Sequence, residues 1–259
     1  MKLSIYQVDA FAEKSFEGNP AAVVPLEAWL PDATMQAIAE ENNLAETAFY
    51  IPTESGFHIR WFTPVKEVKL CGHATLATAF VLFDLLGYSG PVIEFQSLSG
   101  RLSVKKQGDL LQLNFPAQKM EPCETPAELI KGLGESPLEC FCHEDYMAVF
   151  EREETVLGIR PDQAVLEQLD LRGVIITAPS STYDFVVRFF APKSGIPEDS
   201  VTGSAFTKLV PYWAERLGKN SFRAKQVSAR GGKVFCELQD DRVLIAGSAI
   251  KYLVGDIEI

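Results

Sequence analysis

A helical run with almost no charge sets the strongest constraint on this chain. Residues 70–86 read LCGHATLATAFVLFDLL, and Asp84 is the only carboxylate, lysine or arginine in the run. A helix that faces solvent carries polar residues every three or four positions, so a helix without such a stripe has to be enclosed by its own domain. The rest of the fold must therefore surround this helix.

The chain contains a second copy of this arrangement. RWFTP at residues 60–64 is similar to RFFAP at residues 188–192, an offset of 188 − 60 = 128. The helical stretch 71–87 is similar to TGSAFTKLVPYWAERLG at residues 202–218, and both end on Leu-Gly, a common helix cap. A repeat that spans most of the chain predicts two similar domains, which we place at residues 1–116 and 117–248.

Each half also contains a predicted β-hairpin after its helix. GRLSVKKQGDLLQLNF (100–115) and GGKVFCELQDDRVLIAG (231–247) both alternate apolar and polar residues around a turn. One long apolar helix and several strands per half predict an α+β fold, in which each domain is a curved β-sheet or barrel around a central α-helix. We expect Pro211 to distort the second helix, and Lys208, Glu215 and Arg216 to leave it less completely enclosed.

Composition argues against several classes of function. The net charge of −11 and the lack of a Lys/Arg block disfavour a nucleic-acid partner. The apolar run is shorter than the roughly 20 residues of a transmembrane helix, and no signal peptide is recognisable, so we expect a cytoplasmic protein without a membrane partner. Five scattered cysteines and three histidines without HExxH spacing predict neither a disulfide framework nor a metal site.

The starts of the two long helices are candidate anion sites. They read Gly72-His73-Ala74-Thr75 and Gly203-Ser204-Ala205, and we call them the first and second helix mouths. A helix N-terminus offers backbone N–H groups and a positive dipole end, which favour a carboxylate. If the domains pack about a pseudo-twofold axis, both mouths line one cleft and bind the anionic group of a small metabolite. A glycine before a helix can also be a turn residue only.

Glu46 is the candidate for proton transfer. It lies among apolar residues in NLAETAFY, and the second half carries Arg172-Gly173 at the comparable place instead of an acid. A partly desolvated carboxylate is suited to acid–base chemistry. The alternative is an exposed glutamate at a strand edge or a helix N-cap.

Two further residues are candidates beside the mouths. Asp199 in GIPEDSVTGS lies just before the second mouth, where it is either catalytic or an N-terminal cap. Cys71 precedes the first mouth, where it is either a reactive thiol or a small buried apolar residue. A racemase with two thiols would need a second cysteine near Thr202, and none is present.

Five ordered motifs resemble one known family. GNPAAVV, NLAETAF, EVKLCGHATLATAF, GIPEDSVTGSA and SARGG are similar to the phenazine-biosynthesis isomerase-like (PhzF-like) proteins, which share the diaminopimelate epimerase fold. The resemblance covers essentially the full length. It implies a homodimeric isomerase without a cofactor, whose last strand, at residues 249–259, returns to the first domain.

The resemblance also implies roles for individual residues. Glu46 matches the general acid/base of the phenazine enzyme, and residues matching His73, Asp199 and the second Gly-Ser mouth hold its substrate. We place Asn19 of GNPAAVV with the substrate-binding residues. The leading hypothesis is an epimerase or tautomerase that moves a proton on a small carboxylated metabolite. The alternatives are a non-catalytic ligand-binding or protein-interaction module and a Cys71-dependent racemase.

The chain departs from the family pattern at four positions. Residues that differ from the usual aspartate, histidine, proline and histidine are Lys69, Phe80, Ser200 and Phe206. Because Glu46, His73 and Asp199 are retained, these departures are expected to change the substrate rather than the chemistry.

Overall fold

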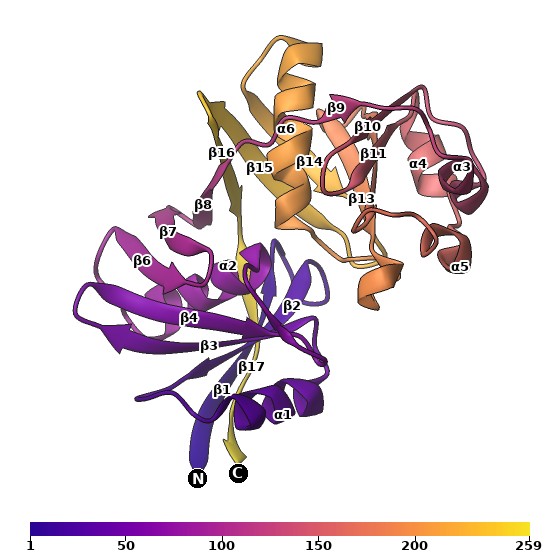
Figure 1. Ribbon diagram of the computed structural model, residues 1–259. Helices are drawn as coiled ribbons and strands as arrows, with labels where there is room; N and C mark the ends of the chain where they lie inside the picture. Colours follow the sequence, from indigo (N-terminus) through magenta and orange to yellow (C-terminus); the bar gives the residue numbers. More distant parts are fainter. The chain divides into compact units, whose positions relative to one another are not determined.

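The computed structural model describes residues 1–259, which divide into two compact units (Figure 1). The first unit comprises Met1–Phe115 and Leu244–Ile259, and the second comprises Pro116–Val243. The sequence placed the return to the first domain at residue 249, whereas the contacts place it at Leu244, inside strand β16 (Arg242–Gly247).

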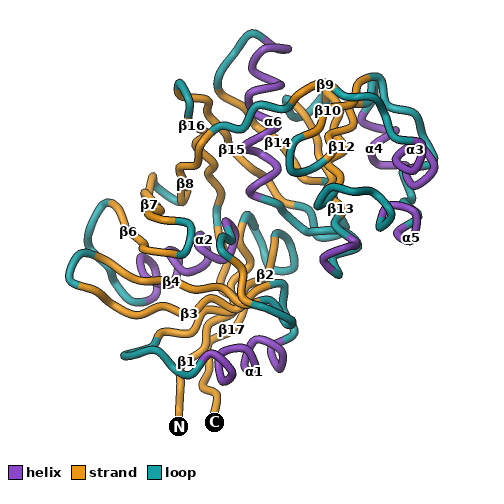
Figure 2. The backbone as a smooth tube through the Cα atoms, in the orientation of Figure 1, coloured by secondary structure: helices purple, strands orange, loops and turns teal.

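The first unit is a sheet with a helix on each of two faces. Its elements are β1 (Lys2–Ala10), β2 (Asn19–Pro25), α1 (Asp32–Asn42), β3 (Glu46–Thr53), β4 (Gly56–Phe62), β5 (Glu67–Val68), α2 (Gly72–Phe80), the π-helical turn η1 (Val81–Leu85), β6 (Val92–Ser97), β7 (Gly100–Gln107), β8 (Leu110–Pro116) and β17 (Ala249–Glu258). β17 pairs antiparallel with β1, and the two chain ends lie side by side there (Figure 2).

The predicted enclosure of the apolar helix is confirmed. Every residue of α2 from His73 to Ala79 is buried, and the helix packs against β1, β2, β3, β7 and β17. The threonine hydroxyls inside it are satisfied locally, because Thr75 donates to the Cys71 carbonyl at 2.6 Å and Thr78 to the Ala74 carbonyl at 2.8 Å. The other sheet face, with Ala22 and Val24, belongs to the apolar cluster that contains α1.

The second unit repeats the strand order of the first. Its elements are β9 (Glu121–Pro122), α3 (Ala127–Leu133), β10 (Glu139–Cys142), β11 (Tyr146–Val149), α4 (Glu153–Gly158), α5 (Gln163–Leu166), β12 (Val174–Pro179), β13 (Phe185–Phe190), the 3-10 turn η2 (Pro192–Ser194), α6 (Gly203–Leu217), β14 (Ser221–Gln226) and β15 (Gly232–Gln239). Pairings β2–β3, β3–β4, β4–β6 and β6–β7 alternate parallel and antiparallel, as do β11–β12, β12–β13, β13–β14 and β14–β15.

One expectation about the second helix needs correction. Lys208 is only 1% exposed, so its charge does not leave α6 open as predicted. Glu215 and Arg216 are exposed as expected, at the C-terminal end. Helix α6 continues through Pro211, so the distortion expected there stays a prediction, and the π-helical turn η1 lies in the first unit.

No helix of the chain is long and apolar enough to cross a bilayer.

Gly18 makes the tight return from β1 to β2 possible. Its φ is 68°, and a Cβ at this position would lie 2.1 Å from the Ala10 carbonyl oxygen. Ala10, the last residue of β1, pairs with Asn19, the first residue of β2. The close approach at Gly18 therefore sets the position of Asn19 at the start of β2.

We predict that Gly18→Ala destabilises the protein more than Gly108→Ala. Gly108 has a φ of 60°, but an added methyl group there would meet open space, so its substitution carries only the left-handed backbone cost of about 1–2 kcal/mol. Gly18→Ala adds an overpacking cost of about 1–3 kcal/mol. Urea unfolding of both variants measures the difference, and equal losses would contradict the close contact.

Candidate functional site

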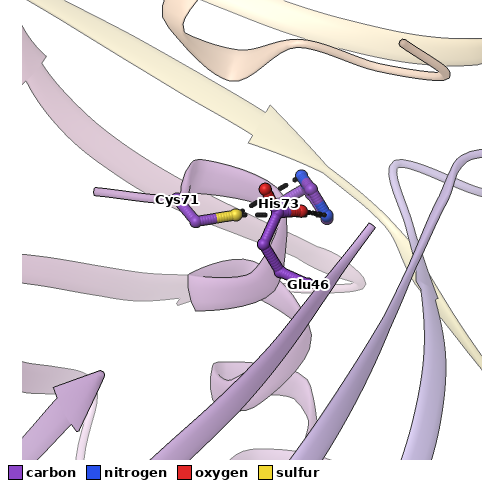
Figure 3. Close-up of side chains that lie close together, drawn as sticks. All are labelled: Glu46, Cys71 and His73. Carbon is purple, nitrogen blue, oxygen red and sulfur yellow. Dashed lines mark hydrogen bonds and ion pairs between the residues drawn. The ribbon is translucent and has the colours of Figure 1, made fainter. Parts of the chain in front are cut away.

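Three chemically active side chains meet at the first helix mouth (Figure 3). Glu46 is the first residue of β3, Cys71 is the N-cap of α2 and His73 is the second residue of α2. His73 Nε2 lies 3.0 Å from Glu46 Oε2, and the Cys71 sulfur lies 3.6 Å from His73 Nδ1. Asn19 Nδ2 lies 3.2 Å from the same Nδ1. The parallel pairing of β2 with β3 brings Asn19 and Glu46 to one end of the sheet.

The charge state of this cluster follows from burial and proximity. Burial disfavours the imidazolium form, yet the Cys71 sulfur and the Glu46 carboxylate outweigh it and raise the pKa of His73 well above its usual value. Burial, reinforced by the negative charge of Glu46, raises the pKa of Cys71 to about 11, although His73 opposes this shift. At neutral pH the Cys71 thiol is therefore protonated, next to the 3.0 Å contact between His73 and Glu46.

One oxygen of Glu46 has no hydrogen-bond partner. Oε2 is buried, and its short contact with His73 is an ion pair without hydrogen-bond alignment. The Glu46 side chain is 13% exposed, so it is neither of the exposed alternatives that the sequence allowed. A carboxylate held mainly by an ion pair keeps acceptor positions for a proton or a ligand.

The second helix mouth carries a different cluster, built on a buried carboxylate. Arg172 donates from Nε to Asp145 Oδ1 at 2.8 Å and from Nη2 to Asp145 Oδ2 at 2.6 Å. Its Nη2 also lies 3.2 Å from Ser204 Oγ, the second residue of α6. Lys208 Nζ contacts Asp145 Oδ2 at 2.7 Å from the other side. Asp145 is fully buried, while the Arg172 side chain is 35% exposed.

The two clusters occupy equivalent places in the repeat. Thr47 pairs with Phe62 and Val174 pairs with Phe190, so the register places Gly173, with Arg172 beside it, where the first unit has Glu46. His73 and Ser204 are each the second residue of their helix. Arg172 was predicted from the sequence at the place comparable to Glu46, whereas Asp145 and Lys208 were not predicted as site residues.

Asp199 holds the segment that leads into α6. Its Oδ2 accepts a hydrogen bond from Thr202 Oγ1 at 2.6 Å, and its carbonyl accepts one from Gln226 Nε2 at 2.8 Å. Thr202, rather than Asp199, is the N-cap residue of α6. Asp199 is also close enough to contribute to the raised pKa of Arg172, which burial opposes and the hydrogen bond to Asp145 favours.

Not all predicted mouth amides are free. The Thr75 amide donates to the Cys71 carbonyl, and the Ala205 amide donates to the Thr202 carbonyl. The expectation of open N–H groups was therefore wrong for Thr75 and Ala205. The N–H groups of Gly72 and Gly203, the first residues of the two helices, lie ahead of the first intrahelical bond. That the two mouths line one cleft stays a prediction.

The sequence profile of the family described as "Phenazine biosynthesis-like protein" matches residues 8–255. The chain belongs to this family. An uncharacterised isomerase of Pseudomonas aeruginosa is 51% identical, with all of both chains covered. The crystal structure of a PhzF-family protein of Enterococcus faecalis, 46% identical, superimposes with a TM-score of 0.98 over all of both chains.

A more distant structure shares the fold. A predicted epimerase of P. aeruginosa, 21% identical, has a TM-score of 0.77 and covers 98% of this chain and 99% of its own. The predicted α+β fold of diaminopimelate epimerase type is confirmed, and the chain is an isomerase of the PhzF family.

The departures from the PhzF-family pattern lie in different surroundings. Phe206 is fully buried and packs on Phe185, with ring centroids 6.3 Å apart. Phe80 is half-buried and lines a surface pocket with Asp84 and Lys106. Lys69 is exposed, and the Ser200 carbonyl accepts a hydrogen bond from Ser228.

The Asp145 cluster predicts a large difference between neighbouring acids. Asp145→Ala leaves the buried Lys208 without its carboxylate and is expected to cost about 3–5 kcal/mol of unfolding free energy. Glu144→Ala removes a side chain that is 51% exposed and is expected to cost about 0–1 kcal/mol. Urea unfolding measures both. The double variant Asp145→Asn/Lys208→Met is expected to be more stable than Asp145→Asn alone, because it removes the unpaired charge. Equal losses of unfolding free energy in Asp145→Ala and Glu144→Ala would refute the buried pair.

The raised pKa of Cys71 predicts a pH profile. In native protein, alkylation of Cys71 by iodoacetamide is expected to rise with pH until about 11, because only the thiolate reacts. In urea-unfolded protein the same rise is expected near about 8.5. Peptide mass spectrometry at each pH measures the modified fraction. If alkylation of Cys71 in the native protein levels off at about the same pH as in the unfolded protein, the pKa of Cys71 is not raised and the prediction is wrong.

Proposed function

We propose that the chain is a cofactor-independent epimerase or tautomerase of a small carboxylated metabolite, with Glu46 as general acid/base. The carrying observation is the buried Glu46 Oε2 without a hydrogen-bond partner, beside His73 at the first helix mouth. The isomerase name of a full-length relative with half its residues identical supports the reaction class.

In this proposal Glu46 removes a proton from a carbon next to an activating group and returns it at another position or face. His73 keeps the carboxylate in place through the ion pair and balances its charge while the proton is absent. When Glu46 accepts the substrate proton, the developing negative charge on the substrate lies near the positive end of α2.

We propose that Arg172 binds the substrate carboxylate at the second mouth. Asp145 holds the Nε and Nη2 edge of the guanidinium, so Nη1 is the donor left to face a ligand. The Phe189 ring, 5.4 Å from the guanidinium carbon, supports its plane. With Ser204 and the start of α6, this gives a carboxylate both charge and direction. Asp199 positions this mouth through Thr202.

The two alternatives are less well supported. A Cys71-dependent racemase needs a thiolate at neutral pH, and a pKa of about 11 leaves Cys71 protonated. A non-catalytic binding module would have its Glu46 fully engaged. The ion pair with His73 partly meets that description, but Oε2 without an aligned donor does not.

The decisive measurement is protein-dependent deuterium exchange from deuterated water into amino and hydroxy acids, followed by NMR. Glu46→Gln is expected to bind the substrate that exchanges while losing nearly all exchange, because an amide cannot take the proton. Glu40→Gln, an exposed change on α1, is the matched control and is expected to keep the wild-type rate. Arg172→Gln is expected to raise KM far more than it lowers kcat.

Exchange at the wild-type rate in Glu46→Gln would reject Glu46 as the base. Exchange lost in both Glu46→Gln and Glu40→Gln would indicate a general folding defect. Urea unfolding of both variants checks this, and each should unfold at the same urea concentration as the parent protein.

We also propose that the chain is a cytoplasmic homodimer. All five cysteines are free, which suits a reducing compartment. Exposed apolar side chains on β17, namely Tyr252, Leu253 and Val254, with Phe16 packed edge-on to Tyr252, support a self-association surface in the first unit.

A further inference from the structure

The Glu46–Cys71–His73 cluster has the composition of a metal site. One ligand atom from each residue lies within 4.8 Å of the other two. A thiolate, an imidazole and a carboxylate are the three ligand types that Zn²⁺ uses, at about 2.0–2.3 Å each. Ligands around a tetrahedral ion at those bond lengths lie roughly 3.5 Å apart. Measured from His73 Nε2, the nitrogen that would bind the ion, the Cys71 sulfur lies 4.0 Å away and Glu46 Oε2 lies 3.0 Å away, so each pair needs a shift of about half an ångström or less to reach these separations.

A second observation points to a ligand rather than to chance packing. Glu46 Oε2 is buried and forms no aligned hydrogen bond, so its ion pair with His73 is an interaction that a bound cation can replace. Figure 3 shows the sulfur, the imidazole and the carboxylate converging on one another. All three side chains come from rigid elements, the start of β3 and the first turn of α2.

We propose that Glu46, Cys71 and His73 bind a zinc-type divalent cation through three protein ligands, with a fourth position left for water. Binding replaces the thiol proton of Cys71 and the imidazolium proton of His73, and both protons leave to solvent without any change of oxidation state. A bound ion coordinates the Glu46 carboxylate, which then cannot accept a substrate proton, so the ion inhibits the enzyme. This inhibition rests on the proposed function, whereas the binding of the ion does not.

Asn19 is the positioning residue for this site. Its side chain contacts His73 Nδ1, so it can fix the ring while Nε2 binds the ion. With the ion on Nε2, Nδ1 carries the proton and the Asn19 amide must present its oxygen. Loss of such an outer partner weakens metal binding roughly ten- to hundredfold in other proteins, and we expect Asn19→Ala to do the same here.

The test is a Co²⁺ titration of the full chain under reducing conditions, because a thiolate bound to Co²⁺ gives a charge-transfer absorption band. One equivalent is expected to produce the band, and Zn²⁺ is expected to displace it. Cys71→Ser is expected to abolish the band, and Glu46→Gln is expected to weaken Co²⁺ binding at least tenfold. Urea unfolding of each variant shows whether it is folded.

The matched control addresses the other thiol group of the chain. Cys123 and Cys140 in the second unit have sulfurs 3.6 Å apart and pack with Cys142. Cys123→Ser is expected to leave the band unchanged. A band that survives in Cys71→Ser, disappears in Cys123→Ser or never forms overturns the proposal.

The metal proposal and the proposed function fail separately. If Glu46→Gln still exchanges deuterium, the function is wrong, and the Co²⁺ band still decides the metal site. If exchange requires Glu46 but no band forms, only the metal site is wrong. Zn²⁺ that displaces Co²⁺ without slowing exchange overturns the inhibitory role.

Discussion

The burial of α2 determines where chemistry can occur in the first unit. A helix whose residues from His73 to Ala79 are all buried has no solvent-facing side to carry functional groups. Its N-terminus is different, because the first backbone N–H groups have no partner inside the helix. The parallel pair β2–β3 begins beside this end, with Ala21 opposite Glu46. The strands that enclose α2 therefore also place the Glu46 carboxylate at the positive N-terminal end of the helix.

The same construction in the second unit carries opposite chemistry. Asp145 and Arg172 lie just before β11 and β12, while Asn19 and Glu46 begin β2 and β3, and α6 corresponds to α2. Here the helix itself contributes a buried cation, Lys208, which only a buried carboxylate can compensate. Asp145 serves both cations, and although burial opposes its charged form, Arg172 and Lys208 lower the pKa of Asp145. The carboxylate that stabilises the core thus also positions Arg172.

The features that sequence predicted are those with local or periodic signals. The apolar run, the two hairpins and the repeat all follow from patterns within short windows, and the PhzF-family motifs point to Glu46. Lys208 could not be predicted as buried, because Asp145 lies 63 residues away in the chain. The Glu46–Cys71–His73 cluster was invisible to spacing rules for a similar reason. Its carboxylate comes from β3, and only the strand register brings it to α2.

Charge balance gives the two units different tasks. Glu46 and His73 sum to zero, so the pair is tolerated in a buried place and can accept a substrate proton by becoming singly positive. In the second cluster Asp145 is shared between Arg172 and Lys208, and the half-exposed Glu144 lies 3.9 Å from Arg172 and 3.4 Å from Lys208, so the partly exposed Arg172 is compensated by a buried acid and by an exposed one. A neutral pair that can gain a proton suits acid–base chemistry, while a cationic group held by a buried acid suits anion binding. The two units share one backbone plan, and the proposed division between proton transfer and carboxylate recognition follows from the different side chains that each unit places at its helix mouth.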